Sequence, residues 1–161
     1  ASSHFNFSVP EPMGVVAVIA PEDQSLLGIV TAIAPLIAGG NTCIVLASES
    51  KPLCAVTFAE VIHSSDVPGG VVNILTGSAA ELHGQFASHM DVNALVYYGA
   101  DKTQLKHMQE QSSLNVKRLF VHPPASVKDP KAQGPYQILD AQEIKTTWHP
   151  IEQIGPGKAG Y

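Results

Sequence analysis

Short, almost wholly apolar runs alternate along this chain with longer segments whose apolar residues recur at helical spacing. The runs lie at residues 13–20, 42–46, 71–75, 93–98 and 116–122. Each contains five to eight residues rich in β-branched side chains, which predicts strands buried on both faces. Strands alternating with helices predict an α/β fold: a Rossmann-like, mainly parallel five-stranded sheet with helices on both faces and right-handed crossovers.

The intervening segments predict helices at residues 25–40, 51–65, 78–89 and 101–113. In the first of them Ser25 is a candidate N-cap, and the pair Gly39-Gly40 is a typical helix stop. Pro35 inside this helix predicts a kink near its end, because proline lacks the backbone N–H that the helix needs.

The alternation stops after residue 122. Residues 123–135 are a proline-rich connector, residues 136–150 predict one further structured arm, and residues 151–161 are an expected tail. Residues 9–122 are therefore expected to form the main domain.

Composition narrows the possible classes of protein. The chain has 161 residues, of which 45% are hydrophobic and 14% charged, as in a packed domain. A net charge of −5 argues against a nucleic-acid surface. The two cysteines, Cys43 and Cys54, predict no disulfide framework. No apolar run reaches membrane-spanning length and no secretory signal is found, so we expect no membrane contact and a cytoplasmic location.

Four stretches then occur in one order: "EPMGVV", "APLIAGGNT", "VPGGVVNIL" and "HMDVNALVYYG". They resemble E-P-V-G-V, A-P-A-L-A-A-G-N-T, L-P-P-G-V-V-N-I-V and H-P-D-V-D-K-V-A-F-T-G of the aldehyde dehydrogenase superfamily. The resemblance runs from about Val9 to His122 and implies that family's NAD-binding-type domain, from a superfamily of oxidoreductases.

The departures from the family's catalytic residues follow the same order. Asp23 stands where the family has an asparagine that helps to hold the oxyanion, and a carboxylate there would oppose the developing negative charge. His122 stands where the family has its general-base glutamate. No cysteine follows Cys54, so the nucleophile motif is missing. We therefore expect no catalytic residues in this chain and regard Asp23 and His122 as degenerate positions.

The cofactor positions also depart from the family. Ala47 replaces the lysine that holds the NAD ribose, and Asp101 adds negative charge where the pyrophosphate would lie. The positions that the resemblance assigns to the cofactor are therefore vestigial: Ala47, Glu49, Gly77, Gly99 and Ala100. We expect no cofactor, or weak NAD binding at most, and no metal site, because the histidines have no convincing ligand spacing.

"QEIKTTWHP" at residues 142–150 resembles the family's C-terminal strand, which packs across subunits. Ile144, Thr146 and Trp148 would point to one side of such a strand and form an interface. The pattern as a whole is most similar to the degenerate C-terminal unit of family 16 aldehyde dehydrogenases. The chain also lacks an initiator methionine, so we expect it to be a piece of a longer protein.

Two functions from different classes remain. The first is a non-catalytic pseudoenzyme domain for oligomerisation or partner docking, through residues 142–150 to another copy or to another aldehyde dehydrogenase-type unit. The second is a residual NAD(P)-binding regulatory module of an active aldehyde dehydrogenase. Glu49, Gly77 and Gly99 favour the second. The residues that favour the first are Ala47, Asp23, Asp101 and His122.

Overall fold

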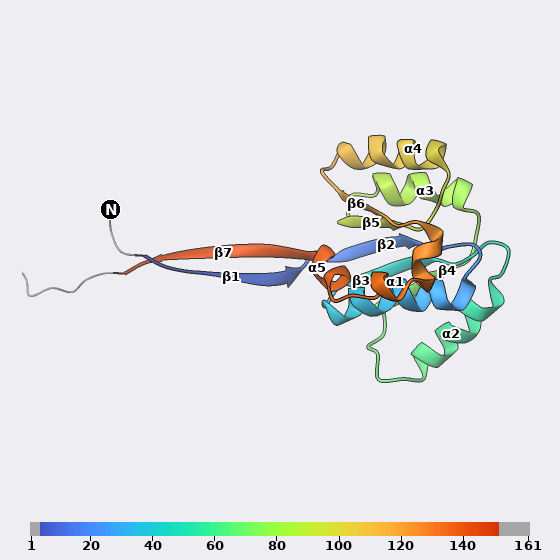
Figure 1. Cartoon of the computed structure of the whole chain (residues 1–161), viewed down its shortest axis with the longest axis horizontal. Coiled ribbons are helices and arrows are strands. Elements are labelled where there is room, and N and C mark those ends of the chain that lie inside the picture. Colours follow the sequence, from blue (N-terminus) through green and yellow to red (C-terminus); the bar gives the residue numbers. More distant parts are fainter. Residues whose placement is uncertain (1–3, 152–161) are drawn as a thin grey trace, which may run out of the picture.

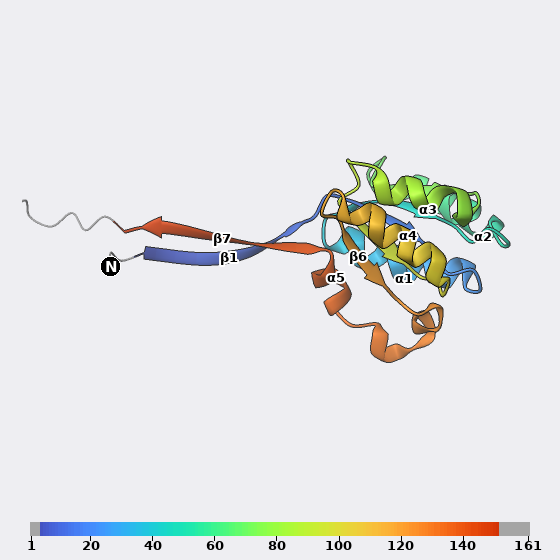
Figure 2. The same cartoon turned by 90° about the horizontal axis from the view of Figure 1, so that it is seen from above.

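The computed structural model describes residues 4–151 as an α/β domain from which a two-stranded ribbon protrudes (Figures 1 and 2). The central sheet consists of β2 (Val15–Ile19), β3 (Thr42–Leu46), β4 (Val72–Leu75), β5 (Ala94–Tyr97) and β6 (Arg118–Val121). Its order is β4-β3-β2-β5-β6, and every neighbouring pair is parallel. The predicted five-stranded parallel sheet is confirmed.

Helices cover both faces of this sheet (Figure 1). The elements on one face are α1 (Ser25–Ala38) and α2 (Leu53–His63), and those on the other are α3 (Ala79–Ser88) and α4 (Lys102–Ser113). Alternate residues of β2 explain this arrangement. Val16 and Val18 pack in the core beneath α1, whereas Ala17 and Ile19 pack with residues of α3 and α4.

One local expectation needs correction. The N-cap of α1 is Gln24, not Ser25, and no side chain caps this end, because Ser25 is already the first helical residue. The helix ends where expected, with Gly39 as its C-cap. The proline-rich connector at residues 123–135 has regular structure of its own. It forms two 3-10 helices, at Pro124–Lys128 and Pro130–Ala132, and anchors them by burying Val127 in the core.

The ribbon joins the first and last described strands. Strand β1 (His4–Pro12), which the sequence reading did not predict, pairs antiparallel with β7 (Gln142–Pro150) along its whole length. The predicted strand at residues 142–150 is confirmed, and α5 (Tyr136–Asp140) precedes it. The arm does not fold back onto the central sheet, because β7 pairs with β1.

Buried polar side chains fix the base of the ribbon to the domain. Asn41, only 1% exposed, accepts a bond from Gly14 N at 3.1 Å and donates to Ala141 O at 3.0 Å and Leu36 O at 3.3 Å. Gln142 donates from Nε2 to Gly39 O at 2.7 Å. The start of β2, the end of α1 and the start of β7 are thus joined through one asparagine.

A lysine plays a similar part on the opposite face of the sheet. Lys117 is 9% exposed, and its Nζ donates to Phe86 O at 3.1 Å and His89 O at 2.7 Å. These carbonyls lie at the C-terminal end of α3, where a helix leaves carbonyls without intrahelical partners and favours a cation. Lys117 therefore ties α3 to the start of β6.

Candidate functional site

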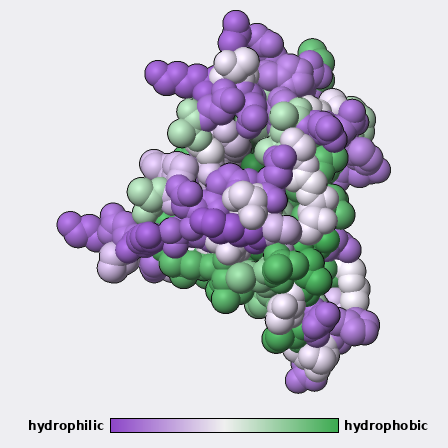
Figure 3. Space-filling model, turned by 90° about the vertical axis from the view of Figure 1, so that its right-hand side faces the viewer, coloured by the Kyte–Doolittle hydropathy of each residue, from purple (hydrophilic) through white to green (hydrophobic). Residues whose placement is uncertain are grey.

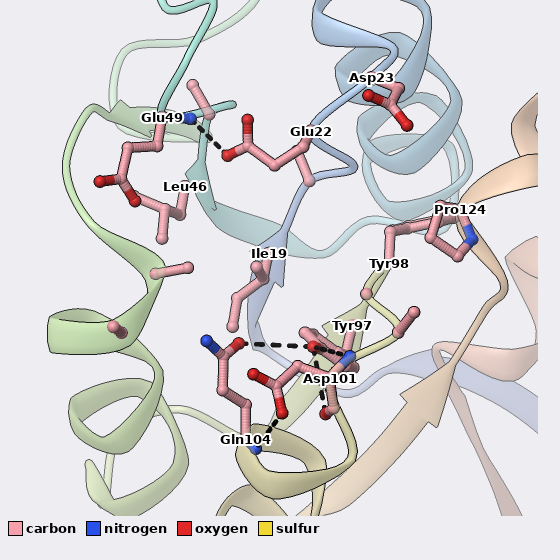
Figure 4. A pocket seen from close by; sticks show the side chains of 16 residues that line it. Ile19, Glu22, Asp23, Leu46, Glu49, Tyr97, Tyr98, Asp101, Gln104 and Pro124 are labelled. Atoms are coloured by element: carbon pink, nitrogen blue, oxygen red, sulfur yellow. Dashed lines mark hydrogen bonds between the residues drawn. The ribbon is translucent and has the colours of Figure 1, made fainter.

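A cavity of about 330 Å³ opens at the carboxyl ends of β2, β3 and β5 (Figure 4). In the strand order, β3 lies on one side of β2 and β5 on the other. The strands after β2 are therefore added first toward one edge of the sheet and then toward the other, although all of them remain parallel. Open α/β sheets bind their ligands at such a switch point. The last residues of the three strands, Ile19, Leu46 and Tyr97, form part of its lining.

One wall of the cavity is organised by Glu22. Its Oε1 accepts a hydrogen bond from Glu49 N at 2.7 Å. Its Oε2 accepts from Ser48 Oγ at 2.7 Å, Ser50 Oγ at 2.9 Å and Ser50 N at 3.3 Å. Burial alone would raise the pKa of the Glu22 carboxyl, but these hydrogen bonds outweigh burial and hold the pKa below its ordinary value of 4.5.

The opposite wall carries a second carboxylate that bonds to backbone. Asp101 is the N-cap of α4, and its Oδ1 accepts from Thr103 N at 2.7 Å and Gln104 N at 3.2 Å. Negative charge at this end of a helix is favourable, because the unpaired N–H groups and the helix dipole both attract it. Figure 4 shows Glu22 and Asp101 on opposite sides of the cavity.

Two consecutive tyrosines lie between these walls. The Tyr97 hydroxyl accepts from Asp101 N at 3.3 Å and lies 3.4 Å from Gln104 Oε1. Burial raises the pKa of Tyr97, and raises that of Tyr98 to about 12, so both phenols stay neutral at physiological pH. Gly99 passes close to the Tyr97 ring, because a Cβ at Gly99 would lie 2.1 Å from Tyr97 Cζ.

The structure brings most of the predicted site residues to this cavity. Its lining includes five of them: Asp23, Ala47, Glu49, Gly99 and Ala100. Gly77 is not part of the lining. The cavity is lined by the carboxylates of Glu22, Asp23, Glu49 and Asp101, and no lysine, arginine or histidine among residues 4–151 joins them there. The cavity is therefore an acidic one.

His122 does not line this cavity but lies behind one of its walls. Its ring stacks on Tyr98 at 5.0 Å between centroids and 25° between planes. Burial lowers the pKa of His122, whereas the nearby Asp140 of α5 opposes that shift. With Tyr98 between it and the cavity, His122 packs against α5 at the base of the ribbon.

Neither cysteine lines the cavity. Cys43 lies in the middle of the sheet, and burial raises the pKa of its thiol to about 12. Cys54 is exposed and lies on α2 in an apolar groove of about 370 Å³ with Leu53, Phe58 and Val61. Figure 3 shows hydrophobic side chains gathered over α1 and α2 at this end of the molecule. The cavity thus contains no thiol.

Sequence reasoning missed several lining residues, including Tyr97, Tyr98, Gln104 and Pro124. The two tyrosines had a usable signal, because they end a buried strand, where ligand contacts concentrate. Glu22 had a signal only as an acidic residue in a loop, since its partners at residues 48–50 follow another strand.

Comparisons with known proteins all point to the same family. The pattern of the aldehyde dehydrogenase family matches residues 1–123. A hydroxyisobutyraldehyde dehydrogenase of Mycolicibacterium austroafricanum is 39% identical over 98 residues, which cover 61% of this chain and 19% of that protein. Aldehyde dehydrogenase family 2 member C4 of Arabidopsis thaliana is 33% identical over 117 residues, covering 73% of this chain and 23% of that protein. The chain spans about a fifth of the length of these relatives.

The solved structures agree. A mutant of aldehyde dehydrogenase C from Pseudomonas syringae, in complex with NAD+ and octanal, superposes with a TM-score of 0.70 at 32% identity. That similarity covers 73% of this chain and 24% of the other. None of the helices in the described part of the chain is long and apolar enough to cross a membrane. The fold, the family pattern and these relatives lead to one conclusion: the chain belongs to the aldehyde dehydrogenase family.

Proposed function

We propose that this chain is a non-catalytic aldehyde dehydrogenase module that assembles with another aldehyde dehydrogenase-type unit within a larger protein. The observation that supports this function is the β1–β7 ribbon. It extends away from the domain as a separate feature and pairs with no third strand among residues 4–151 (Figures 1 and 2). Each of its strands therefore has one free edge in the described structure.

Both faces of the ribbon carry exposed apolar side chains. The register places Phe5, Phe7 and Val9 on one face, where their side chains are 42–58% exposed. It places Ile144 and Trp148 on the other face, 57% and 64% exposed. Two-stranded ribbons are marginally stable in water, and burying a large apolar side chain is worth about 1.5–3 kcal/mol. A partner that covers these faces would stabilise the ribbon.

The ribbon suits docking by strand addition. A free edge supplies backbone donors and acceptors to a partner sheet, and the alternating side chains supply specificity. Thr146, the third residue of the expected interface, has its hydroxyl 2.7 Å from Ser8 Oγ, a contact that holds the two strands together. Lys145 and Glu11 form an ion pair at 2.8 Å on the other face. We infer that Ile144 and Trp148 contact the partner, whereas Thr146 fixes the ribbon.

The cavity supports the non-catalytic part of the proposal. Aldehyde oxidation by a thiol mechanism needs a reactive cysteine beside the bound cofactor. Cys43 is inside the sheet and Cys54 is in the groove on α2, so neither reaches the acidic cavity. Asp23, at the position of the family's oxyanion-holding asparagine, lines that cavity as a carboxylate.

A residual NAD(P)-binding role is the second candidate, and the preserved cavity at the switch point favours it. A relative of solved structure is described as a complex with NAD+. We expect binding to be weak, because four carboxylates line the cavity and no cationic side chain from the described part of the chain accompanies them. At an effective dielectric near 20, a like charge at about 4 Å costs on the order of 4 kcal/mol. Calorimetric titration with NAD separates the candidates: saturation at low micromolar NAD would favour the second.

The test of assembly uses charged substitutions rather than truncation. Removing residues from 140 onward would also remove the Asn41 contact with Ala141, and so would disturb the domain. We expect Trp148→Glu and Phe7→Glu to lower the sedimenting mass of the assembly at matched concentration. Leu53→Glu, at a side chain 79% exposed on α2, is the matched control and should leave that mass unchanged. An unchanged mass in both ribbon variants would refute the proposal.

A further inference from the structure

Glu22 interacts with the loop after β3 in the way that a bound anion would. Its carboxylate is held by two backbone N–H groups, from Glu49 and Ser50, and by two hydroxyls, from Ser48 and Ser50. An ionised carboxylate has about four acceptor sites, so these four donors nearly saturate it. We propose that Glu22 is a built-in anion that closes an anion-binding donor cluster, defined as Ser48, Glu49 and Ser50, to phosphate groups.

One residue of the donor cluster, Glu49, lines the cavity, whereas Ser48 is buried and Ser50 is outside the lining. Glu22 and Glu49 are both lining residues, and Figure 4 shows the Glu22 side chain reaching across to the loop at Glu49. The loop is compact, because Ser48 Oγ also accepts from Lys51 N at 3.2 Å and Ser48 is 1% exposed. Its geometry therefore depends partly on contacts other than those with Glu22. Ser48 Oγ also lies 3.0 Å from the main-chain oxygen of Glu22, which can accept its single proton. Removing the carboxylate should therefore leave two N–H groups and the Ser50 hydroxyl without their acceptor.

A carboxylate tethered by its own chain competes strongly with a free anion. Its local concentration is fixed by the chain, whereas a free phosphate must lose translational freedom to bind. A phosphate that approached the cluster would also meet the negative charge of Glu22 and would have to displace charge-assisted bonds as short as 2.7 Å. The intact protein should therefore not hold phosphate at this place.

The inference rests on the proposed function in one respect, that the cavity is not a working cofactor site. Glu22 would keep phosphate groups out of the donor cluster whether or not the chain assembles with a partner. Phosphate binding is measured at the backbone amides of Glu49 and Ser50, so the result does not depend on the ribbon.

The test is a titration with inorganic phosphate at constant ionic strength, followed through the backbone amide NMR signals of Glu49 and Ser50. Three variants are compared with the intact chain: Glu22→Gln, Glu22→Ala and Asp23→Asn. Asp23 is the matched control, because it lines the same cavity and carries the same charge but makes no hydrogen bond to the cluster among the described residues.

We expect Glu22→Ala to bind phosphate at these amides about tenfold or more tightly than the intact chain, the scale on which one charge-assisted bond changes affinity. Glu22→Gln keeps an acceptor but loses the charge, so it should be intermediate; it carries the test if the alanine variant does not fold. Asp23→Asn removes one charge from the cavity but no bond to the cluster, so it should gain less affinity than either Glu22 variant. The proposal is overturned if neither Glu22 variant gains affinity, or if Asp23→Asn gains as much.

Discussion

Replacing Asn41 by alanine should loosen the junction between the ribbon and the domain. The side chain makes three hydrogen bonds, to Gly14, Leu36 and Ala141, and is 1% exposed. A net contribution of about 1 kcal/mol for each bond gives a loss of about 3 kcal/mol in the free energy of unfolding. In a domain of this size that loss lowers the melting temperature by about 6–12 °C.

The assay is urea unfolding followed by far-UV circular dichroism, with Asn73→Ala as the matched control. Asn73 also donates two hydrogen bonds, to Cys43 O at 3.3 Å and Gly70 O at 2.8 Å, but it is exposed on the edge strand β4. Water can replace its lost bonds, so the control should lose about 1 kcal/mol or less. If Asn41→Ala loses no more than Asn73→Ala, the argument that buried bonds hold this junction is wrong.

Lys117, Cys54 and Glu22 each have an environment whose effect can be measured. Lys117→Met should lower the free energy of unfolding by about 2 kcal/mol, because two carbonyls at the end of α3 lose a charged donor; thermal unfolding measures it. Iodoacetamide should modify Cys54 and spare Cys43 in the folded protein, as peptide mass analysis would report. Despite burial, hydrogen bonds lower the pKa of Glu22 in the folded protein. The contribution of Glu22 to the free energy of unfolding is therefore complete above pH 4.5 and is lost as the pH falls through its folded-state pKa. Glu22→Gln should make the free energy of unfolding depend less steeply on pH in this acid range.

The central sheet was predictable because its inner strands β2 and β5 are buried on both faces. The expectation of burial on both faces was wrong for the edge strands β4 and β6, each of which has two exposed residues. Runs such as residues 42–46 and 93–98 need no distant partner to be recognised, since their apolar character alone excludes an exposed position. The ends of the helices were harder to predict from the sequence. Ser25 is a good capping residue by type, but α1 already includes it and has Gln24 as its N-cap, so residue type alone does not fix the first helical residue.

Strand β1 shows why the rest could not be predicted. Phe5, Phe7 and Val9 alternate with polar residues, which is a strand signal, but Pro10 and Pro12 argue against a strand and the pairing partner follows far along the chain. The same distance hides the Glu22 contact, which depends on two loops that only the finished sheet brings together. Local patterns predict elements, and they do not predict which loops meet.

The pairing of β1 with β7 also sets an order for folding. Ser8 and Thr146 touch across 138 residues of chain, so the ribbon closes a loop that includes the whole sheet, and its entropic cost is recovered only after that sheet exists. The chain contains a single tryptophan, Trp148, which lies in this ribbon. Tryptophan fluorescence therefore reports on the ribbon and not on the central sheet, and during refolding it should change later than the far-UV signal of that sheet.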